Sequence, residues 1–278
     1  MSNDRYATWI SHSSISDFLK CPKSYFFKHV YKNPKTNRKI TIISPPLALG
    51  QSIHEVIETL VLKKVDVRFQ ESLLDSFDVV WSKVSGKKGG FRSLNEEEEY
   101  KTRGKAMIQR VMENPGPLLK LAVKLPSPDP NFPLPRFYLS PEHQIILCGK
   151  IDWMEYIPED DSLHLIDFKT GKHDEDPSSL QLAIYCLLVD NCQKRKIKKV
   201  SYWYLDRDNN PQEVEIPDIE SAKIKLMDLA LKMKAARSLG NFDCPRNGCY
   251  ACSPLIDIVN GKAQYVGAND YQDIYVVN

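Results

Sequence analysis

Residues 145–172 contain two apolar runs, separated by an acidic turn, that constrain the fold more than any other part of the chain. The first run, residues 145–156, is rich in Ile, Leu, Trp and Tyr, and the second, residues 163–169, alternates and ends at Thr170 and Gly171. Runs of β-branched and aromatic residues around a cluster of Pro, Asp and Ser are typical of two strands joined by a turn. We therefore expect a β-hairpin here, with Asp152 on its first strand.

Two carboxylates and one ammonium group belong to this hairpin. Asp167 and Lys169 are two residues apart, so their side chains leave the same face of the second strand. Burying such charges is costly unless they pair or bind a cation, and two carboxylates form a hard oxygen site suited to Mg²⁺ or Mn²⁺. Such an ion could activate a water and neutralise a phosphate, with Lys169 orienting the water. A surface hairpin with an ordinary Asp–Lys salt bridge explains the same residues.

Two predicted helices carry further polar side chains at a spacing of one turn. Over residues 47–64, Gly50, His54 and Glu58 lie four residues apart and share one face. His54 is either a metal ligand supported by Glu58 or a structural histidine. Over residues 178–191, Gln181 and Tyr185 are one turn apart, which also fits a tyrosine in the core with a glutamine at its rim.

The remaining pattern predicts a mixed α/β chain. Pro22 should break residues 13–31 into a kinked helix or two short helices, and further helices are expected over 67–84, 95–113 and 218–239. Residues 32–46 and 114–136 are predicted to be loop, and strands are expected over 199–206 and 212–216. The expected order of elements is a group of helices, three antiparallel strands, a helix, a strand and a helix. This order predicts an α/β sandwich with a mixed sheet.

The composition is that of an ordinary globular protein, with 42% hydrophobic and 27% charged residues. The net charge of +2 is too small to indicate a nucleic-acid partner by itself. No apolar run approaches the roughly 18 residues of a membrane span, and residues 1–14 lack the apolar centre of a signal peptide. We therefore expect a cytoplasmic protein without a membrane partner.

Three of the seven cysteines fall within nine residues: Cys244, Cys249 and Cys252. Pro245 and Gly248 between them allow the chain to bend round one soft metal centre. No fourth ligand lies nearby in the sequence, so a loop of reduced thiols is the alternative. Cys148, Cys186 and Cys192 are expected to be buried free thiols.

Five short motifs occur in order over residues 13–258. They comprise Ser14 and Ser16 followed by Cys21, Pro22, Tyr25 and Phe26; Gly50, His54 and Glu58; Gly149 and Asp152; Asp167, Lys169, Thr170 and Gly171; and Gln181 and Tyr185. In order and spacing they resemble the RecB/AddB-like branch of the PD-(D/E)XK nuclease superfamily, which includes lambda-type exonucleases and the CRISPR adaptation nuclease. Residues 65–140 and the tail match no motif of that branch.

The resemblance implies one nuclease domain over residues 1–278 with a restriction-endonuclease-like α/β core, whose mixed central sheet is flanked by helices. A helical insertion (about 13–125) would precede the catalytic sheet (about 136–240), a cysteine clasp (241–258) and a polar tail (259–278). The implied activity is metal-dependent hydrolysis of DNA, as an exonuclease on single strands or DNA ends in recombination, repair or CRISPR adaptation. Helicase or CRISPR adaptation proteins would be its partners. A catalytically weak DNA-binding or scaffold module, and an RNA-directed role, are the alternatives.

The resemblance also implies roles for individual residues. One or two Mg²⁺ or Mn²⁺ ions would be held by His54, Asp152, Asp167 and the backbone carbonyl of Phe168. Lys169 would position or help to deprotonate the attacking water, and Gln181 and Tyr185 would steady the site or the DNA backbone.

Cys21 is implied as the fourth ligand beside Cys244, Cys249 and Cys252, so that a 4Fe–4S cluster would clasp the two ends of the chain. Zinc in the same four thiolates is the rival occupant. The chain departs from the family at Ile258, where a further cysteine is usual.

Overall fold

The computed structural model describes residues 7–127, 132 and 134–277. The described chain divides into two compact units, each assembled from segments that are distant in sequence. The cysteine unit comprises the described parts of Met1–Ser44, Tyr138–Cys148 and Lys223–Asn278. The sheet unit comprises the described parts of Pro45–Phe137 and Gly149–Ala222.

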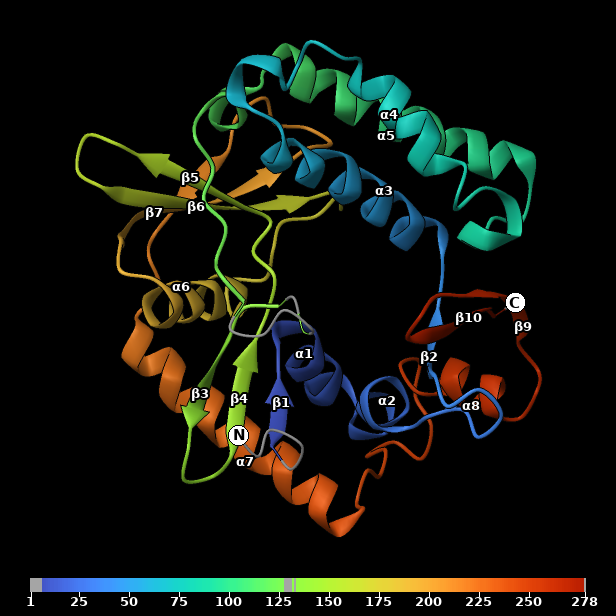
Figure 1. The fold of residues 1–278 in the computed structure, drawn as a ribbon. Helices are drawn as coiled ribbons and strands as arrows, with labels where there is room; N and C mark the ends of the chain where they lie inside the picture. The colour runs from blue at the N-terminus through green and yellow to red at the C-terminus, as the bar shows by residue number, and fades with distance from the viewer. Residues whose placement is uncertain (1–6, 128–131, 133, 278) are drawn as a thin grey trace. The chain divides into compact units, whose positions relative to one another are not determined.

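The sheet unit is built on a four-stranded mixed sheet in the order β5-β6-β7-β8 (Figure 1). β5 (Trp153–Ile157) and β6 (Ser162–Lys169) form the antiparallel hairpin that the sequence predicts. β6 then pairs in parallel with β7 (Lys196–Tyr204) by way of α6 (Gln181–Cys192), and β8 (Gln212–Val214) runs antiparallel to β7. The expected α/β class with a mixed central sheet is therefore confirmed.

β6 is the most buried strand of this sheet, with every residue buried except the last. A strand that is covered on both faces reads as a continuous apolar run, which explains Leu163, Leu165, Ile166 and Phe168. In Figure 1, α6 lies on one side of the sheet and α3 (Pro45–Thr59) on the other. Asp167 is thus a charged residue in an otherwise apolar strand.

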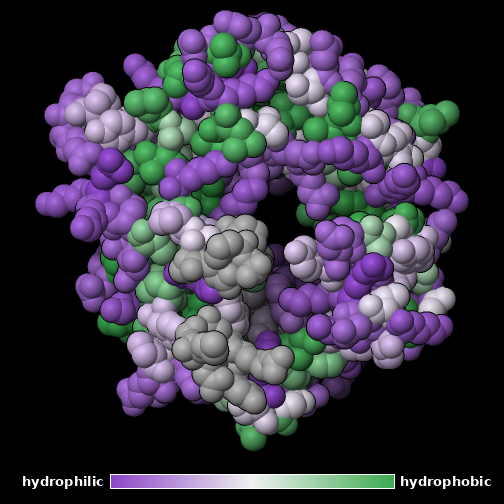
Figure 2. Space-filling view, viewed as in Figure 1, coloured by the Kyte–Doolittle hydropathy of each residue, from purple (hydrophilic) through white to green (hydrophobic). Residues whose placement is uncertain are grey.

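Three helices of the sheet unit pack on one another: α3, α4 (Leu73–Trp81) and α5 (Leu94–Glu113). A Cβ on Gly104 of α5 would lie 2.4 Å from Cζ of Phe77, so the glycine lets α5 approach α4 closely. Over α4 and α5, at the top of Figure 2, hydrophilic residues dominate the visible surface with hydrophobic ones scattered among them. The helices therefore turn their apolar stripes inward, as amphipathic helices do.

The cysteine unit contains two small sheets (Figure 1). One has the order β1-β4-β3, formed by β1 (Thr8–Ile10), β4 (Ile145–Cys148) and most of β3 (Arg136–Ser140). The other has the order β2-β10-β9, formed by β2 (Lys39–Ile42), β9 (Gln264–Ala268) and β10 (Gln272–Val276). Its helices are α1 (His12–Lys20), α2 (Pro22–Tyr25), the π-helix η2 (Phe26–Val30), most of α7 (Ile219–Leu239) and α8 (Ser253–Val259). Pro22 separates α1 from α2, as predicted.

The structure corrects the prediction that residues 145–156 form one strand. β4 ends at Cys148 and β5 begins at Trp153, and the two strands belong to different sheets. Asp152 consequently lies immediately before the hairpin and not on its first strand. Both runs are apolar because each is buried in its own sheet, so composition alone could not separate them.

Two segments for which the sequence predicted no strand contain strands. β2 lies within residues 32–46, and Pro45 and Pro46 begin α3 instead of ending a loop, because proline is tolerated in the first turn of a helix. The polar tail forms the hairpin of β9 and β10, and β10 pairs in parallel with β2. Within the described residues, no helix combines the length and the apolar character needed to cross a bilayer.

Candidate active site

Asp167 and Lys169 lie on β6 at the centre of a hydrogen-bonded cluster. Asp167 is almost fully buried, and its Oδ1 accepts hydrogen bonds from Nε2 of Gln181 at 2.6 Å and from the Tyr185 hydroxyl at 3.0 Å. Its Oδ2 lies 3.0 Å from Nζ of Lys169, which also donates to Oε1 of Gln181 at 2.6 Å. The four-residue spacing on α6 therefore aims Gln181 and Tyr185 at the same carboxylate.

Burial and the negative charge of Asp152 raise the pKa of the Asp167 carboxyl above its usual range, although Lys169 opposes the shift. Burial also raises the pKa of Tyr185, and the two aspartates add to that effect. Tyr185 is therefore a neutral hydrogen-bond donor. Both pKa shifts show that negative charge is concentrated around Asp152 and Asp167. A bound cation would neutralise part of that charge.

A second group of side chains forms around His54 on α3. Nδ1 of His54 lies 3.5 Å from Oδ1 of Asp152 and 3.8 Å from Oε1 of Glu58. One possible ligand atom from each of the three residues lies within 4.8 Å of the others. Burial alone would lower the pKa of His54, but the two carboxylates outweigh it and raise the pKa to about 10. An imidazole nitrogen between two carboxylates is a donor set that fits a divalent metal ion.

The two groups are joined through the end of β6. The backbone N–H of Phe168 donates to Oδ2 of Asp152 at 2.9 Å, and the rings of Phe168 and His54 lie 6.2 Å apart. A Cβ on Gly50 would lie 3.3 Å from Oγ1 of Thr170, so the absence of a side chain there gives α3 its close approach to β6. The structure thus brings all the predicted catalytic and Mg²⁺/Mn²⁺-binding residues into one region of the sheet unit.

Sequence reasoning missed three side chains of this region. Oε2 of Glu175 lies 2.7 Å from Nζ of Lys169, and the Glu175 N–H donates to the hydroxyl of Tyr204 at 2.9 Å. Glu175 lies in an irregular loop, where no periodic pattern indicates which way a side chain points. Lys150 pairs with Glu58, a residue expected only to support His54.

The third is Arg103 of α5, which was predicted only as part of a helix. Its guanidinium donates to the carboxylate of Asp206 at 3.0 Å and to the carbonyl of Thr170 at 2.7 Å. It thereby ties the end of β6 to the turn after β7. Such long-range pairs leave no local signal in the sequence.

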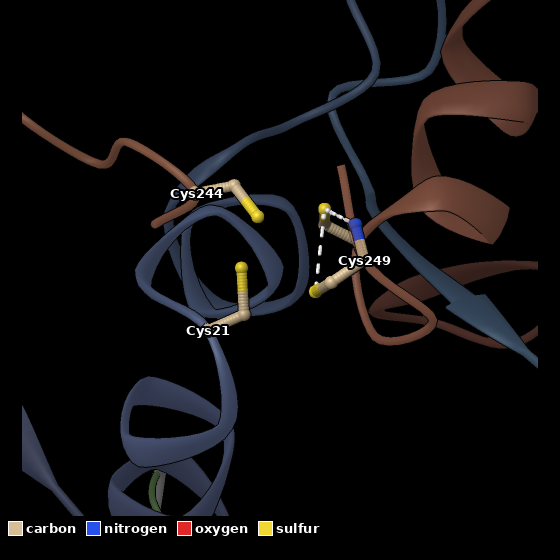
Figure 3. Close-up of side chains that lie close together, drawn as sticks. Cys21, Cys244 and Cys249 are labelled. Atoms are coloured by element: carbon tan, nitrogen blue, oxygen red, sulfur yellow. Dashed lines mark hydrogen bonds between the residues drawn. The ribbon is translucent and has the colours of Figure 1, made fainter. Parts of the chain in front are cut away.

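A separate site in the cysteine unit collects four thiols. Cys21 lies between α1 and α2, whereas Cys244, Cys249 and Cys252 lie in the loop that leads into α8. All four sulfurs lie within 4.8 Å of one another, and Figure 3 shows those of Cys21, Cys244 and Cys249 converging. Cys21 is thus the fourth member of the group, as the resemblance implies.

The surroundings of these thiols favour thiolate at some positions more than at others. Backbone N–H groups of Arg246 and Gly248 lower the pKa of Cys244, and the Gly248 N–H lies 3.4 Å from its sulfur. Burial raises the pKa of Cys21. Three of the four residues are buried and Cys249 is half-buried. Buried thiols packed this closely are typical of a structural metal centre.

Comparison with known protein families gives a match that covers most of the chain. A model of the PD-(D/E)XK nuclease superfamily matches residues 9–253, a range that contains every residue of both candidate sites. No curated protein matches the chain. The mixed sheet flanked by helices and the carboxylate–lysine cluster at the end of β6 agree with that assignment. The chain belongs to the PD-(D/E)XK nuclease superfamily.

Proposed function

We propose that the chain is a metal-dependent deoxyribonuclease that acts as an exonuclease on single-stranded DNA or DNA ends. Membership of the superfamily implies nuclease activity. The observation that carries the proposal is the cluster of Asp167, Lys169, Gln181 and Tyr185 beside the group of His54, Glu58 and Asp152. The finer assignment rests on the five ordered motifs, which resemble the RecB/AddB-like branch. That branch supports a place in recombination, repair or CRISPR adaptation, beside helicase or adaptation proteins.

One or two Mg²⁺ or Mn²⁺ ions would be held by His54, Asp152 and Asp167, together with the carbonyl of Phe168. Glu58 joins this set because its carboxylate lies within the same 4.8 Å as the donors of His54 and Asp152. The bound metal would supply an activated water and charge neutralisation at the phosphate. The surplus of negative charge that raises the pKa of His54 supports cation binding at this place.

The other side chains of the cluster would position the attacking water and the carboxylate of Asp167. Lys169 would direct the attacking water and stabilise the negative charge that develops on the phosphate. Gln181 and Tyr185 would act as positioning residues, because their hydrogen bonds fix the buried carboxylate of Asp167. We propose that the cysteine unit belongs to the same nuclease domain and serves as its structural clasp.

Cys21, Cys244, Cys249 and Cys252 would hold a metal centre, and two arguments favour different occupants. The family resemblance favours a 4Fe–4S cluster. The sulfurs of Cys249 and Cys252, however, lie 3.7 Å apart. Zinc binds thiolates at 2.3 Å in a tetrahedron, which sets its sulfurs about 3.8 Å apart. In a four-iron cluster each thiolate binds a different iron, so the four sulfurs would have to move outward.

A nuclease assay tests the main proposal. End-labelled single-stranded, duplex and circular DNA are incubated with the purified protein in Mg²⁺, in Mn²⁺ or in EDTA. We expect labelled linear DNA to shorten progressively with either metal, and EDTA to stop the reaction. Cleavage of circles would replace the exonuclease assignment with an endonuclease. DNA that is bound but not cut with any metal would favour the scaffold alternative.

Metal analysis tests the cysteine site. Anaerobic purification followed by assays of iron, labile sulfide and zinc identifies the occupant directly. A brown protein with broad absorbance near about 400 nm and about four irons per chain would support the cluster. A colourless protein with one tightly held zinc would support the tetrahedral ion.

A further inference from the structure

A cavity of about 360 Å³ lies beside the candidate metal site in the sheet unit. Asp152 and Glu58 belong to both places, so a ligand in the cavity would lie next to anything held at the metal site. The volume falls within the range of pockets that hold small organic ligands, about 300–1,000 Å³.

The walls of this cavity are mainly apolar and its remaining lining is charged. The apolar part is made by Val61, Leu62, Val123, Leu125, Trp153 and Met154. The charged part comprises Glu55, Glu58 and Asp152 with two exposed lysines, Lys124 and Lys150. An apolar pocket with a few polar groups is the usual form of a site for a small organic ligand.

One side chain of the wall is unusual for an ordinary surface. Leu62 is 73% exposed, although leucine is among the residues that most often lie inside a protein. A ligand with an apolar face would cover it.

We propose that this cavity receives the base of an unpaired nucleotide adjacent to the phosphate at the metal site. The inference rests on the proposed nuclease function. Bases present an apolar face whatever their identity and stack on protein side chains without sequence preference. Lys124 and Lys150 are the positively charged residues of the lining, and phosphates that flank the base would compete with Glu58 for Lys150.

The geometry also assigns a class of substrate. A base in a duplex must leave its stack and its partner before it can enter a protein pocket, whereas a base in a single strand has less to lose. The cavity therefore selects single strands and frayed ends over internal duplex. It acts on specificity and needs no contact with the reacting phosphate.

Abasic substitution tests the pocket directly. A set of single-stranded oligonucleotides carries one abasic nucleotide, moved through successive positions, and the cleavage ladder is recorded under single-turnover conditions. Base stacking on a protein predicts that cutting at the phosphate beside the missing base falls roughly 5- to 100-fold. Cutting at other phosphates should not change. An even ladder at every position would overturn the pocket.

Two variants and two matched controls connect the effect to the cavity. Val61→Trp fills the cavity and Leu62→Ser removes an apolar contact, so both should cut intact DNA more slowly and lose their sensitivity to the missing base. Val79→Trp and Leu94→Ser make the same changes at exposed positions of α4 and α5, and should retain the wild-type pattern. Thermal melting establishes that each variant folds. Loss of abasic sensitivity in the controls, or its survival in both cavity variants, would contradict the inference.

A binding assay without cleavage separates this inference from the proposed function. Short oligonucleotides of about four nucleotides, intact or abasic, are titrated in Ca²⁺ and followed by fluorescence anisotropy. If the protein binds intact DNA more tightly than abasic DNA but cuts neither, the base-binding cavity is supported and the proposed nuclease function is contradicted. If it cuts DNA but binds both oligonucleotides equally, the nuclease function is supported and the base-binding cavity is contradicted. If it neither cuts DNA nor distinguishes the two oligonucleotides, both proposals are contradicted.

Discussion

Oε2 of Glu175 lies 2.7 Å from Nζ of Lys169, so the two side chains form an ion pair. Lys169 also lies 3.0 Å from Oδ2 of Asp167 and donates a hydrogen bond to Oε1 of Gln181. A water or a phosphate that approaches Lys169 must therefore compete with the charge of Glu175. Asp167 and Gln181 are joined by a hydrogen bond, so Glu175, in the loop after β6, is the partner that can leave most easily.

Glu175→Gln should raise the cleavage rate. The amide retains the size of the side chain but removes the charge that holds Lys169 and repels DNA. Because a partly exposed ion pair is worth about 0.2–1 kcal/mol, we expect an increase of roughly 2- to 5-fold in kcat/KM. Asp176→Asn, an exposed acid in the same loop bonded to Ser178, is the matched control. A fall to the level of a lysine-deficient enzyme would mean that Glu175 positions Lys169 for the reaction.

Lys169→Ala and Asp167→Asn should each abolish cleavage while DNA binding remains. Removing one group that stabilises transition-state charge typically lowers kcat by about 100-fold or more. Lys172→Ala, three residues further along at an exposed position, controls for the loss of a positive charge. Circular dichroism and DNA affinity are measured beside the rate. Near wild-type turnover in either variant would contradict the proposed roles.

His54→Ala should increase the Mn²⁺ concentration needed for half-maximal activity by about 10-fold or more, by analogy with the loss of groups that support metal ligands. Removing Nδ1 takes one donor from the group of His54, Glu58 and Asp152. Gln51→Ala, at an exposed position of the same helix, is the control. An unchanged metal requirement in His54→Ala would indicate that the histidine only packs.

The local part of this site could be predicted from sequence because its signals are periodic. Alternation placed Asp167 and Lys169 on one face of β6, and a four-residue spacing placed Gln181 and Tyr185 on one face of α6. Each pair needs only the geometry of its own element. Such patterns remain readable even when the ends of the element are displaced by a few residues.

The strand pairings and the position of Glu175 could not be predicted, because they depend on contacts between segments that are far apart in the chain. β1 pairs with β4, and β2 pairs with β10, through strands of only three to five residues. Strands this short have too few residues to establish an alternation, and their partners are not encoded locally. Glu175 was missed for the same reason, since the conformation of its loop decides that it meets Lys169.

Asp17 should make the stability of the cysteine unit depend on pH in the acid range. Its carboxylate lies 2.8 Å from Nζ of Lys28 and 2.9 Å from Nε2 of His29. Burial alone would raise the pKa of Asp17, but these two bonds outweigh it and hold the pKa below its usual range. The folded pKa is thus lower than the unfolded pKa of about 3.9. The contribution of Asp17 to stability is therefore fully present at a pH above its unfolded pKa. That contribution is lost as the pH falls through its folded pKa.

Asp17→Asn should therefore lower the free energy of unfolding by about 1–3 kcal/mol at neutral pH, and by progressively less in acid. Urea denaturation of both proteins between neutral pH and about pH 3 measures the difference. Glu142→Gln, at an exposed turn of the same unit, is the control. A difference that is independent of pH would show that Asp17 stabilises α1 in some way other than through its charge.

Cys21→Ser should remove the metal centre as completely as Cys249→Ser does. Cys21 is contributed by the start of the chain and the other three thiols by its end, and all four sulfurs lie within 4.8 Å of one another. Losing either residue leaves three thiolates, which do not complete a closed four-thiolate site. Metal content per chain and melting temperature should fall together in both variants. Cys192→Ser, a half-buried cysteine outside the group, should change neither. Metal loss with Cys249→Ser but full retention with Cys21→Ser would show that the centre is built by the C-terminal loop alone and does not link the two ends of the chain.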